Sequence, residues 1–94
     1  MSQTPLIVTT EVSLYPLLEN VEPPIIAFIQ ALRGQPGIEV ITNAMSTQVK
    51  GPFEAVQQAL ATCMRDVLAG PDTVVFVTKT LNLDLAIDEV PELD

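Results

Sequence analysis

Four neutral hydrogen-bonding side chains lie close together near the middle of this 94-residue chain: Thr42, Asn43, Ser46 and Thr47. An amide group both donates and accepts, and so does a hydroxyl, which suits them to hold the polar edge of a small ligand. Nucleophilic or acid–base catalysis would need a general base beside them, and the chain contains no histidine. The cluster therefore predicts ligand binding without catalysis, and the protein is not expected to be an enzyme.

The composition argues against several other kinds of site. The net charge is −8, from 12 acidic residues against four basic ones, so Lys and Arg are too few to form a patch that binds nucleic acid or an anionic membrane. Cys63 is the single cysteine, which excludes an intramolecular disulfide and any Cys-x-x-Cys motif. Without histidine, zinc sites and Ser-His-Asp triads are also excluded. We expect no metal and no cofactor, and we expect Cys63 to be a buried packing residue.

The predicted location of the protein is the cytoplasm. No apolar run approaches the ~18–20 residues that span a bilayer. The first residues also lack the basic start and cleavage pattern of a signal peptide.

Positioning these polar groups requires regular elements, and the first is a strand over residues 6–15, which are rich in β-branched types and are followed by Pro16. Alternation places Val12 and Leu14 on one face of that strand and Ser13 and Tyr15 on the other. Further strands are predicted at residues 38–43, 46–50 and 73–80.

Proline and glycine mark the ends of two predicted helices. Pro23 and Pro24 are tolerated only in the first turn of a helix, which the apolar spacing continues to Arg33. Gly34 is expected to take the left-handed conformation that ends many helices. The second helix is predicted between Gly51-Pro52 and Gly70-Pro71.

The resulting order is strand, helix, strand, strand, helix, strand. This order is typical of the ferredoxin-like α+β fold, a two-layer βαββαβ sandwich whose antiparallel sheet carries both helices on one face. Residues 1–81 are predicted to form a single domain and residues 82–94 an acidic, solvated C-terminal tail. Because the last strand is an apolar edge strand and one sheet face is bare, we expect a homo-oligomer.

The connection between the second and third strands is also informative. Ala44-Met45 is not the Asn-Gly pair of a tight two-residue hairpin, so a bulge or a wider turn is expected there. Such a feature often redirects side chains near a site.

Two segments resemble the YkoF-like thiamine-binding protein family: Ser-Leu-Tyr-Pro-Leu at residues 13–17 and Ser-Thr-Gln-Val-Lys-Gly at residues 46–51. The resemblance extends over residues 8–80 and is to single-repeat members. It implies a non-enzymatic, cytoplasmic ferredoxin-like protein that forms dimers or tetramers. It also implies binding of thiamine, its hydroxymethylpyrimidine precursor or a related compound, in vitamin salvage or transport.

The polar cluster suits such a ligand. Its side chains can satisfy the aminopyrimidine edge, Tyr15 can offer a ring face to the cationic thiazolium, and Glu11 or Glu39 can supply a compensating charge. Met45 would form a soft wall. The candidate ligand-binding residues are Ser13, Tyr15, Thr42, Asn43, Met45, Ser46 and Thr47.

Each assignment has an alternative that the sequence leaves open. Tyr15 is equally suited to an interface, and Asn43 to a turn. At the level of the whole protein, the alternative is a structural or regulatory assembly subunit whose open sheet face binds another protein. An enzyme acting through Ser46, Thr47 or Tyr15 is a third hypothesis, which the absence of a neighbouring base disfavours.

Overall fold

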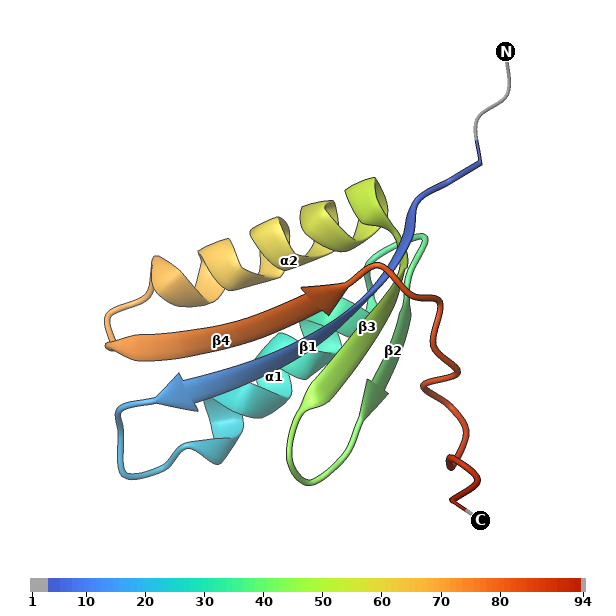
Figure 1. Cartoon of the computed structure of the whole chain (residues 1–94). Coiled ribbons are helices and arrows are strands. Elements are labelled where there is room, and N and C mark those ends of the chain that lie inside the picture. Colours follow the sequence, from blue (N-terminus) through green and yellow to red (C-terminus); the bar gives the residue numbers. More distant parts are fainter. Residues whose placement is uncertain (1–3, 94) are drawn as a thin grey trace.

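The computed structural model describes residues 4–93 and contains the six predicted elements in the predicted order (Figure 1). They are β1 (Ile7–Pro16), α1 (Glu22–Arg33), β2 (Glu39–Thr42), β3 (Thr47–Pro52), α2 (Phe53–Leu68) and β4 (Val74–Leu81).

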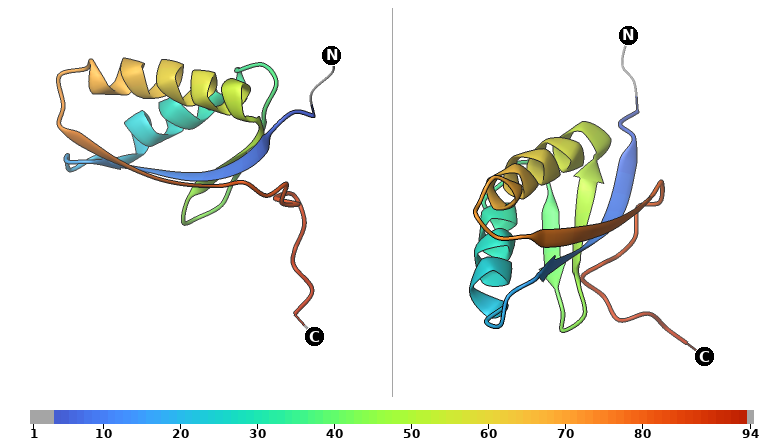
Figure 2. Two further views of the ribbon diagram at one scale, coloured as in Figure 1. Left: turned by 45° about the horizontal axis from the view of Figure 1, so that its top comes forward. Right: turned by 90° about the vertical axis from the view of Figure 1, so that its left-hand side faces the viewer.

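The four strands form one sheet in the order β2-β3-β1-β4, and every neighbouring pair is antiparallel. Both helices lie on the same face of this sheet, as the left view of Figure 2 shows. The ferredoxin-like α+β fold is therefore confirmed, with β4 at one edge of the sheet.

The core lies between the sheet and the helices. The predicted alternation along β1 holds, since Val12 and Leu14 are buried under the helices. From α1, Leu32 has no exposed surface, and the ring of Phe28 packs against that of Phe76 with centroids 5.0 Å apart. Cys63 of α2 is buried in this layer, as expected.

The expectation for Gly34 is wrong. Its φ is −82°, and its N–H donates to the carbonyls of Gln30 and Ala31, so the last turn of α1 tightens and stays right-handed. The chain reverses later, where Gly37 follows Pro36 and has a φ of 78°. A type II turn places glycine at that position, because φ is positive there.

A pair of threonine hydroxyls links β1 to β4. Thr10 is fully buried, and its Oγ1 lies 2.7 Å from Oγ1 of Thr80. The hydroxyl of the exposed Thr80 thus gives the buried Thr10 hydroxyl a partner, which removes the cost of burying it unpaired. The sequence analysis did not anticipate this pair.

In the chain after β4, residues 83–85 are exposed, as a solvated tail would be, but hydrogen bonds join them to the sheet. Thr9 Oγ1 donates to the carbonyl of Leu83 (2.8 Å) and accepts from the N–H of Leu85 (3.3 Å). Lys50 Nζ donates to the carbonyl of Leu85 (2.7 Å) and lies 3.0 Å from the Asp84 carboxylate. Figure 2 shows this segment on the face opposite the helices. We call residues 83–85 the C-terminal strap.

We expect Lys50→Met to loosen the strap and to raise the hydrogen-exchange rate of the Leu85 amide several-fold at pH 7. The hydrogen bond to Asp84 raises the pKa of Lys50. The ion pair therefore contributes below the unfolded-state pKa of lysine and is lost as the pH rises through the raised value. Lys79→Met, which removes an ion pair elsewhere on the same face, is the control. Equal exchange in both variants would contradict a clamping role for Lys50.

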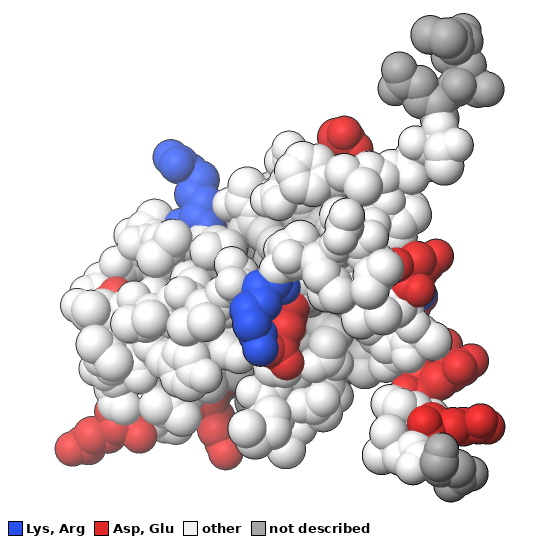
Figure 3. Space-filling view, in the orientation of Figure 1, with Lys and Arg blue, Asp and Glu red and all other residues white. Residues whose placement is uncertain are grey.

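Among residues 4–93, no helix has the length and apolar character needed to cross a bilayer. Nor does this part of the chain bring three metal-binding side chains together. On the face drawn in Figure 3, acidic groups lie near the C-terminal end and also along the lower left edge, and the few basic groups lie apart from one another.

Candidate ligand-binding site

A pocket of about 250 Å³ opens where the β2–β3 turn meets the end of β1. We call it the hairpin pocket. It is lined by residues 12–15 of β1, by Ile25, Phe28 and Ile29 of α1, and by residues 42–47. All seven candidate residues from the sequence analysis line this one pocket.

The pocket exists because β3 is shorter than β1. Pairing between them ends at Val12–Thr47, while β1 continues to Pro16 beside β4. In an antiparallel sheet, successive residues direct their backbone groups to alternate neighbours. Either Ser13 or Leu14 therefore presents a backbone N–H and C=O towards the hairpin pocket, with no strand to pair with them. This open edge of β1 offers a donor and an acceptor to a planar ligand.

Thr42 and Thr47 face each other across the β2–β3 ladder, and their hydroxyl oxygens are 3.0 Å apart. One hydroxyl donates to the other, which leaves a single O–H of the pair for another acceptor. Thr47 is buried and Thr42 half-buried, so this group sits at the inner end of the pocket.

Asn43 holds the turn. Its Oδ1 accepts from the N–H of Met45 (2.8 Å) and of Ser46 (3.1 Å), and its own N–H donates to the carbonyl of Ser46 (3.0 Å). A four-residue turn results, as the sequence predicted, without a bulge in the flanking pairs. The side-chain oxygen of Asn43 is thus already hydrogen-bonded within the turn. The N–H groups of its side-chain amide are the part that can bind a ligand.

Ser46 connects the turn to the open face of the sheet. Its hydroxyl donates to Glu11 (2.8 Å) and accepts from the Gln48 amide (2.9 Å). Glu11 also pairs with Lys79 at 2.9 Å, and hydrogen bonds from Lys79 and then Ser46 lower the pKa of its carboxyl. Ser46 is consequently held in one orientation by its neighbours, and we regard it as a positioning residue of the pocket.

At its mouth the pocket is lined by an exposed methionine and by an aromatic residue. Met45, at 86% exposure, has few neighbours to fix it, and unbranched methionine adapts readily to a ligand. Tyr15 is about half exposed, on the open face of β1 beside Val75 of β4. Ser13 lies two residues earlier on the same face.

Sequence reasoning missed the apolar floor of the site. Ile25, Phe28 and Ile29 were expected on the buried stripe of α1, and their helical spacing was the available signal. Their place under the β2–β3 turn depends on how α1 crosses the sheet, which the spacing does not encode.

The expected compensating carboxylates are not in the pocket. Neither Glu11 nor Glu39 lines it; Glu11 pairs with Lys79, and Glu39 lies 3.9 Å from Lys50. No charged side chain contributes to the lining. The hairpin pocket is therefore a neutral site with an apolar floor and hydrogen-bonding sides.

No family model and no curated protein matches the sequence. Solved structures do resemble the fold. A hypothetical protein from Methanocaldococcus jannascii is similar at 28% identity with a TM-score of 0.70, covering 90% of this chain and 86% of that one. A domain of unknown function, DUF77, from Bacillus cereus is similar at 20% identity with a TM-score of 0.71, covering 89% and 86%.

A further structure with this fold comes from Thermotoga maritima and bears the name "putative thiamine biosynthesis/salvage protein". Its identity to this chain is 18% and its TM-score 0.61, over 77% of this chain and 81% of that protein. At these identities the Bacillus and Thermotoga proteins share the fold with this chain. The structural neighbours thus include a protein named for thiamine chemistry and proteins without an assigned function.

Proposed function

We propose that this protein is a non-enzymatic binding protein for thiamine or its hydroxymethylpyrimidine precursor, of the YkoF-like kind, and that the hairpin pocket is its site. The observation that carries the proposal is the meeting of seven predicted residues around one neutral pocket at the open edge of β1. The sequence resemblance and the name of the Thermotoga neighbour support the same class of ligand.

The pyrimidine half fits the chemistry of the inner end. An aminopyrimidine presents ring acceptors and an amino donor in one plane, and the pocket offers the backbone edge of β1, the free hydroxyl of the Thr42–Thr47 pair and the Asn43 amide. The apolar floor under α1 suits the ring faces. The cationic thiazolium would then lie at the mouth, near Tyr15 and Met45.

Phosphorylated forms should bind weakly. Their charge is best held by Lys or Arg, and neither residue type contributes to the lining. The surrounding chain is also acidic, with a net charge of −8. The expected order of affinity is therefore thiamine or hydroxymethylpyrimidine first and thiamine phosphate last.

Thermal shift with thiamine, hydroxymethylpyrimidine, thiazole alcohol and thiamine phosphate tests the proposal. A ligand at a hundred times its dissociation constant adds ~2.7 kcal/mol of stability. For a domain of this size that is a rise of roughly 10–20 °C in melting temperature. We expect the rise with thiamine or the pyrimidine, and no rise with any of the four compounds would overturn the proposal.

A hydroxyl-deletion variant locates the site. We expect the double substitution Thr42→Val and Thr47→Val to lower affinity for the pyrimidine at least tenfold, which is ~1.4 kcal/mol. Removing both partners of a hydrogen bond while keeping their shape has little effect on folding, so the loss should be confined to binding. Isothermal titration calorimetry measures it. Thr62→Val on α2, distant from the pocket, is the matched control; equal affinity in both variants would exclude the hydroxyls.

A second function, that of an assembly subunit, is favoured by the open face at the β1–β4 end. Tyr15 of β1 pairs there with Val75 of β4, and Val77 lies two residues further along β4 on the same face. Each of these three side chains is roughly half exposed. β4 also leaves its outer edge unpaired among residues 4–93, and such edges associate unless protected. We propose that the protein forms a homo-oligomer through this end, with or without a ligand.

Val77→Lys should weaken that association at least tenfold, because it places a charge in the apolar part of the proposed interface. Sedimentation velocity over a dilution series measures the change. Val90→Lys is the control, since Val90 is 91% exposed beyond the C-terminal strap. If the wild-type protein is monomeric at every concentration, self-association is excluded.

A further inference from the structure

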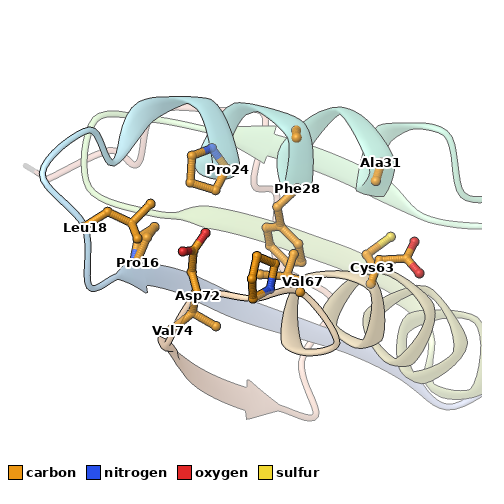
Figure 4. Close-up of a pocket in the computed structure, with 13 residues that line it drawn as sticks. Pro16, Leu18, Pro24, Phe28, Ala31, Cys63, Val67, Asp72 and Val74 are labelled. Carbon is orange, nitrogen blue, oxygen red and sulfur yellow. The ribbon is translucent and has the colours of Figure 1, made fainter.

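A second pocket, of about 360 Å³, lies between α1 and α2 where β1 ends and β4 begins. We call it the interhelix pocket. Figure 4 shows Phe28 reaching from α1 towards α2, with Cys63 and Val67 on the opposite side. Pro16 and Val74 line it from the sheet.

The pocket is open because the facing side chains are small. Ala27 and Ala31 are one helical turn apart on α1, and both line the gap; Gly70 lies across it, after the end of α2. Larger residues at these positions would fill the groove between the helices, as close packing normally does. The volume has room for roughly a dozen non-hydrogen atoms, since a water molecule takes ~30 Å³ of liquid.

The charge of the lining has a single sign. Asp66 and Asp72 are its only charged members, and Figure 4 shows the Asp72 carboxylate directed between the walls. Within residues 4–93, neither aspartate forms an ion pair with a lysine or arginine. Burial and then the charge of Asp66 raise the pKa of the Cys63 thiol, and both residues line the pocket.

We propose that the interhelix pocket binds a small amphipathic cation, a protonated amine or quaternary ammonium on an apolar body. The apolar body lies against Phe28, Ala31 and Val67, and the positive charge lies at the Asp66–Asp72 rim. Charge complementarity selects this ligand, because the walls are apolar, the rim carries two unpaired carboxylates and the whole chain is acidic. This pocket shares only Phe28 with the hairpin pocket, which has no charged lining.

Cys63 can report on the pocket, because it is the only cysteine and lines it. Its side chain is buried, so a reagent reaches the thiol only when the helices open locally, and a ligand bound in the pocket slows that opening. The experiment measures the rate of modification of Cys63 by methyl methanethiosulfonate, by mass spectrometry, in the presence of benzylammonium, benzyl alcohol or benzoate. These probes share one ring and differ in charge. We expect benzylammonium to slow modification at least fivefold more than benzyl alcohol at equal concentration, and benzoate to have no effect. Equal protection by the charged and neutral probes would overturn cation selection.

Variants separate the two parts of the site. The double substitution Asp66→Asn and Asp72→Asn should reduce protection by benzylammonium at least fivefold and leave that by benzyl alcohol unchanged. Ala31→Leu should abolish protection by both probes by filling the pocket. Ala61→Leu, on an exposed part of α2 outside the lining, is its control. If Ala31→Leu leaves protection intact, the probes bind elsewhere and the proposal is wrong.

The same assay distinguishes other occupants. Protection that rises with protein concentration, without probe, would assign the groove to a second copy of the chain and overturn the proposal. The Thr42→Val and Thr47→Val double variant should retain full benzylammonium protection. Loss of protection in that variant would mean that one site serves both ligands, contrary to the inference.

Discussion

Leu32→Ala is expected to lower the free energy of unfolding by ~2–5 kcal/mol, a large part of the ~5–15 kcal/mol that holds a typical domain. Leu32, in the last turn of α1, has no exposed surface and packs in the hydrophobic core. Truncation leaves a cavity that the two-layer core cannot close without moving a helix. For a domain of this size the melting temperature should fall by roughly 10–30 °C.

Chemical denaturation with urea measures this loss. Leu68→Ala is the matched control, because Leu68 ends α2 with 55% of its surface exposed and should change stability by no more than ~0.5 kcal/mol. Leu32 lies one turn after Phe28, which lines both pockets, so ligand affinity should fall together with stability. A destabilisation below ~1 kcal/mol would mean that the core repacks around the cavity.

Gly51→Ala adds a single methyl group and is nevertheless expected to lower the stability of the sheet clearly. A Cβ at Gly51 would lie 2.7 Å from the carbonyl oxygen of Gly37, and backbone cannot move away as a side chain can. The strain should cost ~1–3 kcal/mol. Because this close contact lies beside the Glu39–Lys50 pair that begins the β2–β3 ladder, the Thr42–Thr47 pair at its other end should also be disturbed.

Gly34→Ala is the control for glycine removal. A Cβ there would meet only ordinary contacts, 3.5 Å from the Ala31 carbonyl oxygen, at a φ that alanine adopts freely. It should be neutral or stabilise by up to ~1 kcal/mol through the unfolded chain. Two-dimensional NMR of the Gly51→Ala variant should show shifted Thr42 and Thr47 signals. Unchanged signals there would show that the ladder absorbs the added methyl group.

Local patterns were enough to predict the fold and to group the candidate residues. Alternation placed Val12 and Leu14 under the helices, and proline placed the start of α1, because both signals act over a few residues. A bulge or a wider turn was predicted between β2 and β3 because a tight-turn pair is lacking, and the wider turn is the one that forms. Since hairpin neighbours are close in sequence, Thr42 and Thr47 were correctly expected together.

Features that depend on distant parts of the chain were not predictable in this way. The Thr10–Thr80 pair and the bonds of Thr9 to the C-terminal strap join residues more than 65 positions apart, and no local pattern specifies such partners. The interhelix pocket follows from the spacing of two helices that are far apart in sequence. Its one visible signal was the Ala27–Ala31 pair, which on its own is also what an exposed helix face contains.

The strand order has a consequence for folding speed. β1 is central in the sheet but first along the chain, and its partner β4 comes last, so that Thr9 pairs with Leu81. The contact order is therefore high, and a nucleus containing β1 must close loops of most of the chain's length before these contacts form. During synthesis the edge of β1 that pairs with β4 would stay unpaired until β4 had left the ribosome. We accordingly expect folding in the slower range for small two-state domains, with completion after translation of β4.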